Sequence, residues 1–147
     1  MNALFLLKSK ATVTVCYDDN TLRRGMENLR ASGFTALPVI TRSGDYVGCV
    51  NEGDFLWYLY DHPDTKPEGT PLSALVRTGW NPAVTVDVTM DELMQRAANQ
   101  NFVPVVDDRN KFIGIITRKD ILEYFYHRER PDTTQGTEFP VPQQMEG

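Results

Sequence analysis

Two short polar stretches of the chain combine residue types that could bind an anionic ligand carrying hydroxyl groups. An aspartate carboxylate can accept hydrogen bonds from two neighbouring hydroxyls, which is the arrangement a ribose presents. A hydroxyl and cations at a helix start suit a phosphate, because the free N–H groups of the first turn also favour an anion. One stretch has all of these types and is therefore a candidate ligand-binding site, namely Thr117, Arg118, Lys119 and Asp120. The other stretch is Asn51-Glu52-Gly53-Asp54.

These stretches close two copies of one longer phrase. Residues 37–56 (LPVITRSGDYVGCVNEGDFL) and 103–122 (VPVVDDRNKFIGIITRKDIL) align without a gap, at a constant offset of 66 positions. Matched pairs include Gly48 with Gly114 and Asp54 with Asp120. A fixed-period repeat in a short chain indicates duplication. A unit of about 60 residues buries only about 60% of its unfolded surface, so we expect the copies to pack together and share a core.

The hydrophobic pattern predicts the order strand–helix–strand–strand–helix in each copy, which is an α/β (α+β) fold. The first helix of each copy is expected to bury one apolar face, formed by Leu22, Met26 and Leu29, and by Met90, Leu93, Met94 and Ala97. Expected strands are 13–17, 34–41, 46–50, 83–88, 102–106 and 112–117, and the closing helices are 53–60 and 119–128. Residues 2–8 are expected to form a short helix that docks on the body.

The 147-residue chain divides into three expected parts. Residues 1–66 hold the N-terminal helix and the first copy, and residues 67–130 hold the second copy. Residues 131–147 are rich in Pro, Thr, Gln, Gly and Glu, with isolated apolar residues. This composition predicts a disordered tail.

Composition and charge argue against several function classes. A net charge of −5 argues against nucleic-acid binding, which needs a basic face. The apolar run Ala3–Leu7 is far shorter than the ~20 residues that span a bilayer, and it has no signal-peptide flanks, so no membrane association is expected. Cys16 and Cys49 are the only cysteines and are expected to be reduced core residues of a cytosolic protein. His62 and His127 are isolated, so no metal site is predicted.

The repeated order of elements resembles a known family. A middle strand opens with the pattern h-P-h-h, where h is an apolar residue, and a hairpin closes with G-h-h-(T/S)-x-x-D. Two copies of this arrangement in register, over about residues 10–128, resemble the CBS domain pair, or Bateman module. The resemblance implies a pseudo-twofold disc that binds adenine-nucleotide-type ligands in clefts between the copies and pairs into dimers.

The resemblance also implies that each cleft is completed by residues of the other copy. The Asp120 cleft, named for its aspartate, is expected to add Lys10, Thr12, Thr35 and Ala36 to Thr117–Asp120. The Asp54 cleft is expected to use Asn51, Asp54, Phe102 and Val103. Glu52 would repel phosphate and Phe102 adds bulk, so the Asp54 cleft is expected to bind more weakly.

The predicted function is a stand-alone regulatory module that senses an adenine nucleotide or dinucleotide second messenger, without catalysis or a cofactor. The candidate ligands are AMP, ADP, ATP and cyclic di-AMP. Cyclic di-AMP is included because some free-standing CBS pairs with a phrase similar to GFTALPV, here residues 33–39, are receptors for it. A homodimer and an unidentified regulated protein are the expected partners.

Three alternatives remain open at this stage. The fold could be a constitutive dimerisation scaffold with empty clefts. The chain could be a nucleotide hydrolase that uses Asp54 and Asp120, although these are expected to lie in different clefts; a nucleic-acid role is the third alternative. For the individual residues, the aspartates could only stabilise their helices, by ~0.3–1 kcal/mol, and Thr117 could only cap one.

Overall fold

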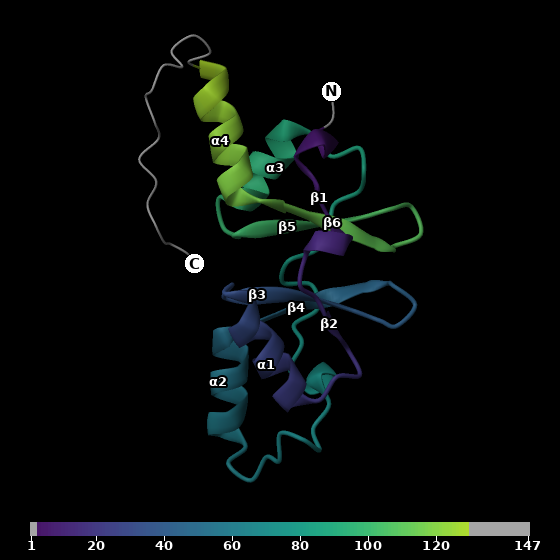
Figure 1. Cartoon of the computed structure of the whole chain (residues 1–147), viewed down its shortest axis with the longest axis vertical. Helices are drawn as coiled ribbons and strands as arrows, with labels where there is room; N and C mark the ends of the chain where they lie inside the picture. Colours follow the sequence, from purple (N-terminus) through teal and green to yellow (C-terminus); the bar gives the residue numbers. More distant parts are fainter. Residues whose placement is uncertain (1–2, 130–147) are drawn as a thin grey trace.

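The computed structural model describes residues 3–129, in which two small sheets lie at the centre and the helices cover their outer sides (Figure 1). The helices are α1 (Leu22–Ser32), α2 (Glu52–Asp61), α3 (Met90–Ala97) and α4 (Arg118–Glu129). The strands are β1 (Lys8–Ser9), β2 (Cys16–Tyr17), β3 (Ala36–Ile40), β4 (Tyr46–Asn51), β5 (Phe102–Val106) and β6 (Phe112–Thr117). The predicted mixed fold of two similar copies is confirmed, whereas the expected tail at 131–147 lies outside the described residues.

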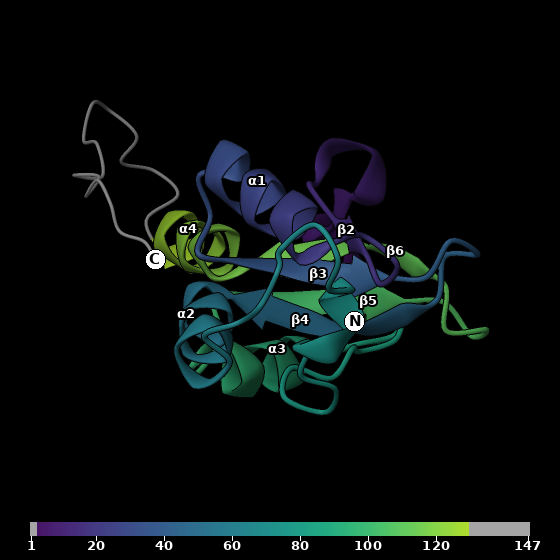
Figure 2. The same ribbon diagram turned by 90° about the horizontal axis from the view of Figure 1, so that it is seen from below.

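Each sheet contains the predicted hairpin and one further strand. The orders are β2-β3-β4 and β1-β6-β5, and the hairpins β3–β4 and β5–β6 are antiparallel. Where the sheets meet, a shared core buries Ile40, Cys49, Phe102, Phe112 and Ile115. Viewed along the long axis, α1 lies on the same side as α4 and α2 on the same side as α3, as a pseudo-twofold relation between the copies requires (Figure 2).

The two copies exchange the segments that precede their first strands, which we call the lead segments (residues 3–9 and 72–77). Ala3 is buried in the hydrophobic cluster of the second copy, whereas Leu72 and Leu75 are buried in that of the first. In the same way Lys8 pairs with Ile115 of β6, and Arg77 bridges to Cys49 of β4. Each lead segment therefore completes the copy that it does not belong to in sequence.

The matched glycines of the repeat are explained by this exchange. A Cβ atom at Gly48 would lie 2.5 Å from the carbonyl oxygen of Arg77. A Cβ atom at Gly114 would overlap the carbonyl oxygen of Lys8. Only glycine lets the crossing backbone approach so closely.

Three expected elements differ in the structure. The strand at 83–88 is wrong, because only Val84 bridges to Val105 and a turn from Thr85 to Val88 follows at once. The strand at 13–17 shortens to β2. The helix at 2–8 is a single 3-10 turn at Leu4–Leu6 that leads into β1, although its docking on the body is confirmed by the burial of Ala3.

The expected inner faces of α1 and α3 are wrong at one position each. Met26 and Met94 are 39% and 44% exposed. In α1 the buried stripe contains Gly25 instead, since a Cβ there would press on Leu72 and Phe55. The methionines therefore lie on the outer surface.

The tips of the two hairpins contact each other at the end of the sheets away from the starts of α2 and α4 (Figure 1). Lys111 Nζ lies 2.9 Å from Asp45 Oδ1, and Phe112 N–H donates to the carbonyl of Gly44 at 2.8 Å. The hydrogen bond from Lys111 holds the pKa of Asp45 below its usual range. The copies are thus joined at the hairpin tips, and the helix starts lie at the opposite end.

Both cysteines are free and buried, as predicted. Burial raises the pKa of the Cys49 thiol to about 11, so it stays protonated at neutral pH. Among residues 3–129, no helix is both long and apolar enough to cross a bilayer.

Candidate functional site

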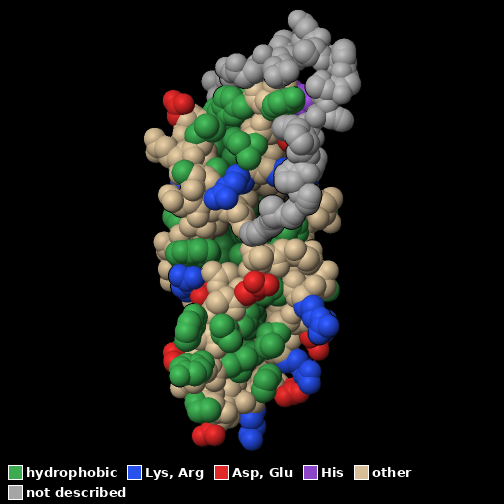
Figure 3. All heavy atoms as spheres, turned by 90° about the vertical axis from the view of Figure 1, so that its left-hand side faces the viewer, with side chains coloured by type: hydrophobic (Ala, Val, Ile, Leu, Met, Phe, Trp, Pro, Cys, Tyr) green, Lys and Arg blue, Asp and Glu red, His purple; other side chains and the backbone are tan. Residues whose placement is uncertain are grey.

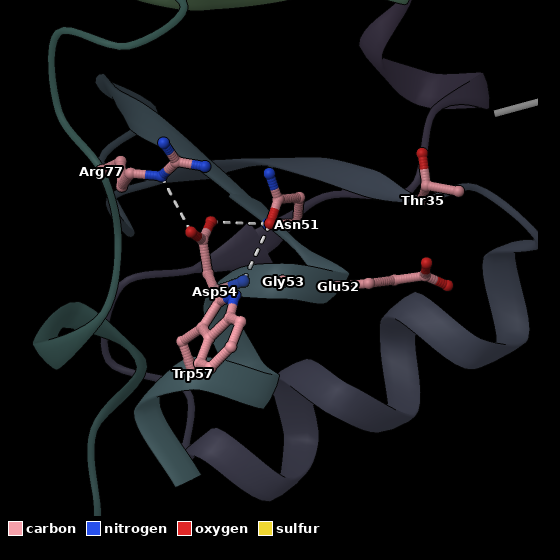
Figure 4. Close-up of a pocket in the computed structure, with 7 residues that line it drawn as sticks. All are labelled: Thr35, Asn51, Glu52, Gly53, Asp54, Trp57 and Arg77. Carbon is pink, nitrogen blue, oxygen red and sulfur yellow. Dashed lines mark hydrogen bonds and ion pairs between the residues drawn. The ribbon is translucent and has the colours of Figure 1, made fainter. Parts of the chain in front are cut away.

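A hollow of about 590 Å³ opens where β4 passes into α2. Its residues come from the position before β3, the end of β4, the start of α2 and the second lead segment (Figure 4). The lining residues are Thr35, Asn51, Glu52, Gly53, Asp54, Trp57 and Arg77. The hollow therefore contains Asn51 and Asp54, two of the residues predicted for the Asp54 cleft.

The first turn of α2 fixes the Asp54 carboxylate. Asn51 is the N-cap, and its Oδ1 accepts from the N–H of Asp54 at 2.8 Å. In return Asp54 Oδ2 accepts from the N–H of Asn51 at 2.8 Å, which completes a capping box. Asp54 therefore stabilises the start of its helix, which was the alternative role expected for it. The same hydrogen bonds orient its carboxylate into the hollow.

Arg77 connects this carboxylate with an aromatic ring. Its Nε donates to Asp54 Oδ1 at 2.8 Å, and its guanidinium carbon lies 4.4 Å from the centre of the Trp80 ring. The Asp54 side chain is 10% exposed and that of Arg77 is 45% exposed. The cation thus covers the carboxylate from the solvent side.

A second hollow of about 190 Å³ adjoins the first, since Thr35 and Asn51 line both. Its other lining residues are Ala36, Trp80, Asn81, Asn99, Gln100, Asn101 and Phe102. Amide side chains dominate this wall, and two aromatic rings accompany them. Amides offer both donors and acceptors, which suits the polar edge of a flat heterocycle.

The start of α4 has a related but different arrangement. Thr117 Oγ1 accepts from the N–H of Asp120 at 3.1 Å, so the expected capping role of Thr117 is present. Lys8 Nζ lies 3.2 Å from Asp120 Oδ2, which mirrors the pair of Arg77 and Asp54. Arg118 Nε donates to the carbonyl of Ala97 at 2.8 Å, and this bond satisfies the C-terminal end of α3.

The structure brings some of the predicted site residues together and separates others. Asn51 and Phe102 line the smaller hollow together, as expected, but Val103 is fully buried in the core. Thr35 and Ala36 also line these hollows, which contain neither Thr117 nor Asp120. The reason is register, because Ala36 pairs with Asn51 across the β3–β4 hairpin.

The remaining predicted residues are Lys10, Thr12 and Lys119. Lys10 and Thr12 belong to an exposed 3-10 turn that contacts β6. Lys119 is exposed at the first turn of α4. Of the residues predicted to complete the Asp120 cleft, Lys119 therefore lies beside Asp120, whereas Lys10 and Thr12 follow the pairing of Ser9 with Gly114, and Ala36 pairs with Asn51.

Sequence reasoning missed Lys8, Arg77 and Trp80. The available signal was a cation shortly before the first strand of each copy. Lys8 and Arg77 are 69 positions apart by subtraction, so they fall outside the gap-free alignment of residues 37–56 with 103–122, whose offset is 66. Their role depends on the exchange of lead segments, which the sequence pattern does not contain.

The comparison with family models decides the family. The model described as "CBS domain" matches residues 9–61 and 72–127, one match for each copy. The chain belongs to the CBS domain family. The boundaries of the two CBS domains coincide closely with the two structural copies.

Similar proteins have the same architecture. A crystal structure of CbpB in complex with c-di-AMP matches with a TM-score of 0.83 and 27% identity, over 90% of this CBS pair and 89% of that chain. A structure of CBSX2 in complex with AMP matches with a TM-score of 0.71 and 21% identity, over 88% and 98% of the two chains. A CBS domain-containing protein of Dictyostelium discoideum is 25% identical over 126 residues, covering 80% of this chain and 86% of its relative.

Proposed function

We propose that this CBS pair is a regulatory module that binds an adenine nucleotide or an adenine dinucleotide second messenger between its two copies, without catalysing a reaction. The observation that carries the proposal is the Asp54 cleft, now defined by its two joined hollows. It combines a carboxylate for hydroxyls, a guanidinium for phosphate and an amide-rich wall for a base. The similar proteins CbpB and CBSX2, crystallised with c-di-AMP and with AMP, support this ligand class.

We assign the second binding position to the start of α4. In this proposal Thr117 and Asp120 face the ribose and phosphate, and Lys10, Thr12, Arg118 and Lys119 supply further polar and cationic contacts. Asp120 is more accessible than Asp54, with a side chain 26% exposed against 10%. This difference supports tighter binding in the Asp120 cleft than in the Asp54 cleft. Thr35 and Ala36, which lie near Asp54, are proposed to contact the base.

AMP and cyclic di-AMP should be distinguishable by their riboses. AMP presents two free vicinal hydroxyls, whereas the 3′ oxygen of cyclic di-AMP is esterified. A carboxylate that accepts two hydroxyl hydrogen bonds therefore favours AMP, ADP or ATP. The cytosol is the proposed compartment, and the two free, buried cysteines agree with a reducing environment.

Thermal unfolding in the presence of AMP, ATP and cyclic di-AMP tests the proposed function. A ligand present at a hundred times its dissociation constant should stabilise the protein by ~2.7 kcal/mol. Asp120→Ala should reduce this gain, because it removes the carboxylate of the tighter cleft. If none of the three nucleotides raises the midpoint, the scaffold alternative replaces the sensor.

We further propose that the module forms a homodimer through the outer faces of its helices. Apolar side chains gather on the first copy on the side shown in Figure 3. Exposed large apolar residues of α1 and α2 include Met26 at 39% and Leu56 at 61%. The matched positions Met94 and Leu122 of the second copy are exposed too, at 44% and 59%. Apolar surface that clusters in this way is typical of an interface.

Leu56→Glu should therefore convert the dimer to a monomer, since it places a charge in the proposed interface. Sedimentation velocity measures the outcome. Val86→Glu is the matched control, because Val86 is also an exposed apolar residue (39%) but lies in a turn outside the helices. A wild-type protein that sediments as a monomer at all concentrations, or a control that dissociates equally, contradicts the proposal.

A further inference from the structure

The side chain of Arg77 contacts two groups that a nucleotide in the Asp54 cleft would need. It donates to Asp54 Oδ1 at 2.8 Å in the larger hollow. It also lies 4.4 Å from the centre of the Trp80 ring, which lines the smaller hollow. Arg77 therefore extends from the carboxylate that could bind hydroxyls to the aromatic wall that could contact a base.

The carboxylate of Asp54 is already occupied in this arrangement. One oxygen accepts from Arg77 and the other from the N–H of Asn51. A ribose that donates both hydroxyls to Asp54 must compete with the guanidinium for Oδ1. Separating a partly buried ion pair is unfavourable unless the cation gains a new partner, because both charges would lose an interaction.

We propose that Arg77 is a phosphate gate that makes the Asp54 cleft selective for phosphorylated ligands; this rests on the proposed function. Without ligand, Arg77 holds Asp54. A nucleotide gives the guanidinium a phosphate, which its planar donors match well, and thereby releases Asp54 for the ribose. A nucleoside brings no anion, so it has to break the ion pair without replacing it.

The change of partner from Asp54 to a phosphate needs only a movement of the Arg77 side chain. The N–H of Arg77 donates to the carbonyl of Cys49 at 3.2 Å, and its own carbonyl packs on Gly48. The backbone of Arg77 is therefore fixed to β4. The outer nitrogens of its guanidinium turn away from Asp54, and Glu52 extends away from both residues (Figure 4). The phosphate position proposed beside Arg77 therefore lies on the side away from the Glu52 carboxylate.

The chain contains its own reporter for this cleft. It has two tryptophans, Trp57 and Trp80, and each lines one of the two hollows. Intrinsic tryptophan fluorescence therefore responds to the Asp54 cleft, whereas calorimetry registers binding at either cleft. The two measurements together locate a bound ligand.

The test is titration of AMP and adenosine, followed by fluorescence and by calorimetry, on the wild type and Arg77→Gln. Wild-type protein should bind AMP more tightly than adenosine at the Asp54 cleft. Arg77→Gln should weaken AMP binding by about tenfold or more, the size expected for one lost charge-assisted hydrogen bond, and leave adenosine binding unchanged or tighter. Arg42→Gln is the matched control, because Arg42 likewise pairs with a carboxylate (Asp19, 3.0 Å) and covers a ring (Tyr17, 4.1 Å) outside both hollows.

Each other outcome overturns the gate in a recognisable way. Equal loss of AMP and adenosine affinity in Arg77→Gln would mean that Arg77 only maintains the shape of the cleft. Calorimetric heat without a fluorescence response in the wild type would place the ligand elsewhere, so the gate fails and the proposed function stands. If AMP, ATP and cyclic di-AMP all give neither heat nor a fluorescence response, the gate and the proposed function both fail.

Discussion

Gly114→Ala should lower the free energy of unfolding by about 3 kcal/mol or more. The new methyl group would overlap the carbonyl of Lys8, and the backbone of Gly114 has a φ of 155°, which side chains rarely adopt. Overpacking against backbone costs about 1–3 kcal/mol, and a strained φ adds to it. Urea denaturation measures the effect as a lower transition midpoint.

Gly69→Ala supplies the control for this substitution. A Cβ there would make ordinary van der Waals contact, 3.8 Å from the carbonyl of Lys66. Its effect should stay within about 0.5 kcal/mol. Gly48→Ala should resemble Gly114→Ala, since its methyl group meets the carbonyl of Arg77 at 2.5 Å. Equal stability of Gly114→Ala and Gly69→Ala would refute the close crossing of the lead segment.

Asn81→Leu should destabilise the protein by about 2–4 kcal/mol, although leucine has a similar size. Asn81 is 2% exposed; its Nδ2 donates to the carbonyl of Phe102 at 3.1 Å and its Oδ1 accepts from Arg96 at 3.2 Å. Substitution removes both bonds while their partners stay near the core, and such losses cost about 1–3 kcal/mol each.

Asn99→Leu is the matched control for the buried amide. Asn99 lines the same smaller hollow as Asn81 but is exposed. Chemical denaturation of both variants separates the structural role of Asn81 from a general change in the wall of the hollow. If the two variants unfold at the same denaturant concentration, Asn81 is not the structural centre that its hydrogen bonds indicate.

The sequence was sufficient to predict the duplication and the general layout of each copy. The shared phrase paired Gly48 with Gly114 within the second strand of each hairpin. It did not identify the backbone that crosses these glycines, because that backbone belongs to Lys8 and Arg77, which lie outside the aligned phrase. The exchange of lead segments is determined by tertiary packing, and local hydrophobic periodicity does not predict it.

Helical periodicity was also ambiguous on the outer surface. Met26 and Met94 are one position away from the buried stripe of their helices, and spacing alone could not assign them to the core or to the surface. The candidate site was likewise predicted only in part. Asn51 and Asp54 were found from local helix-start chemistry, whereas Trp80 joins them only through the contact of distant segments.

The exchange of lead segments makes each copy depend on the other. A single copy would leave its own lead segment unpaired, and the second copy alone would lack strand β1 of its sheet. Two such chains could satisfy each other by domain swapping, each inserting its lead segment into the other. Because both copies lie in one chain, the same exchange takes place within the molecule. Gly48 and Gly114 mark the two points where these segments cross, so a substitution at either glycine loosens the connection between the copies.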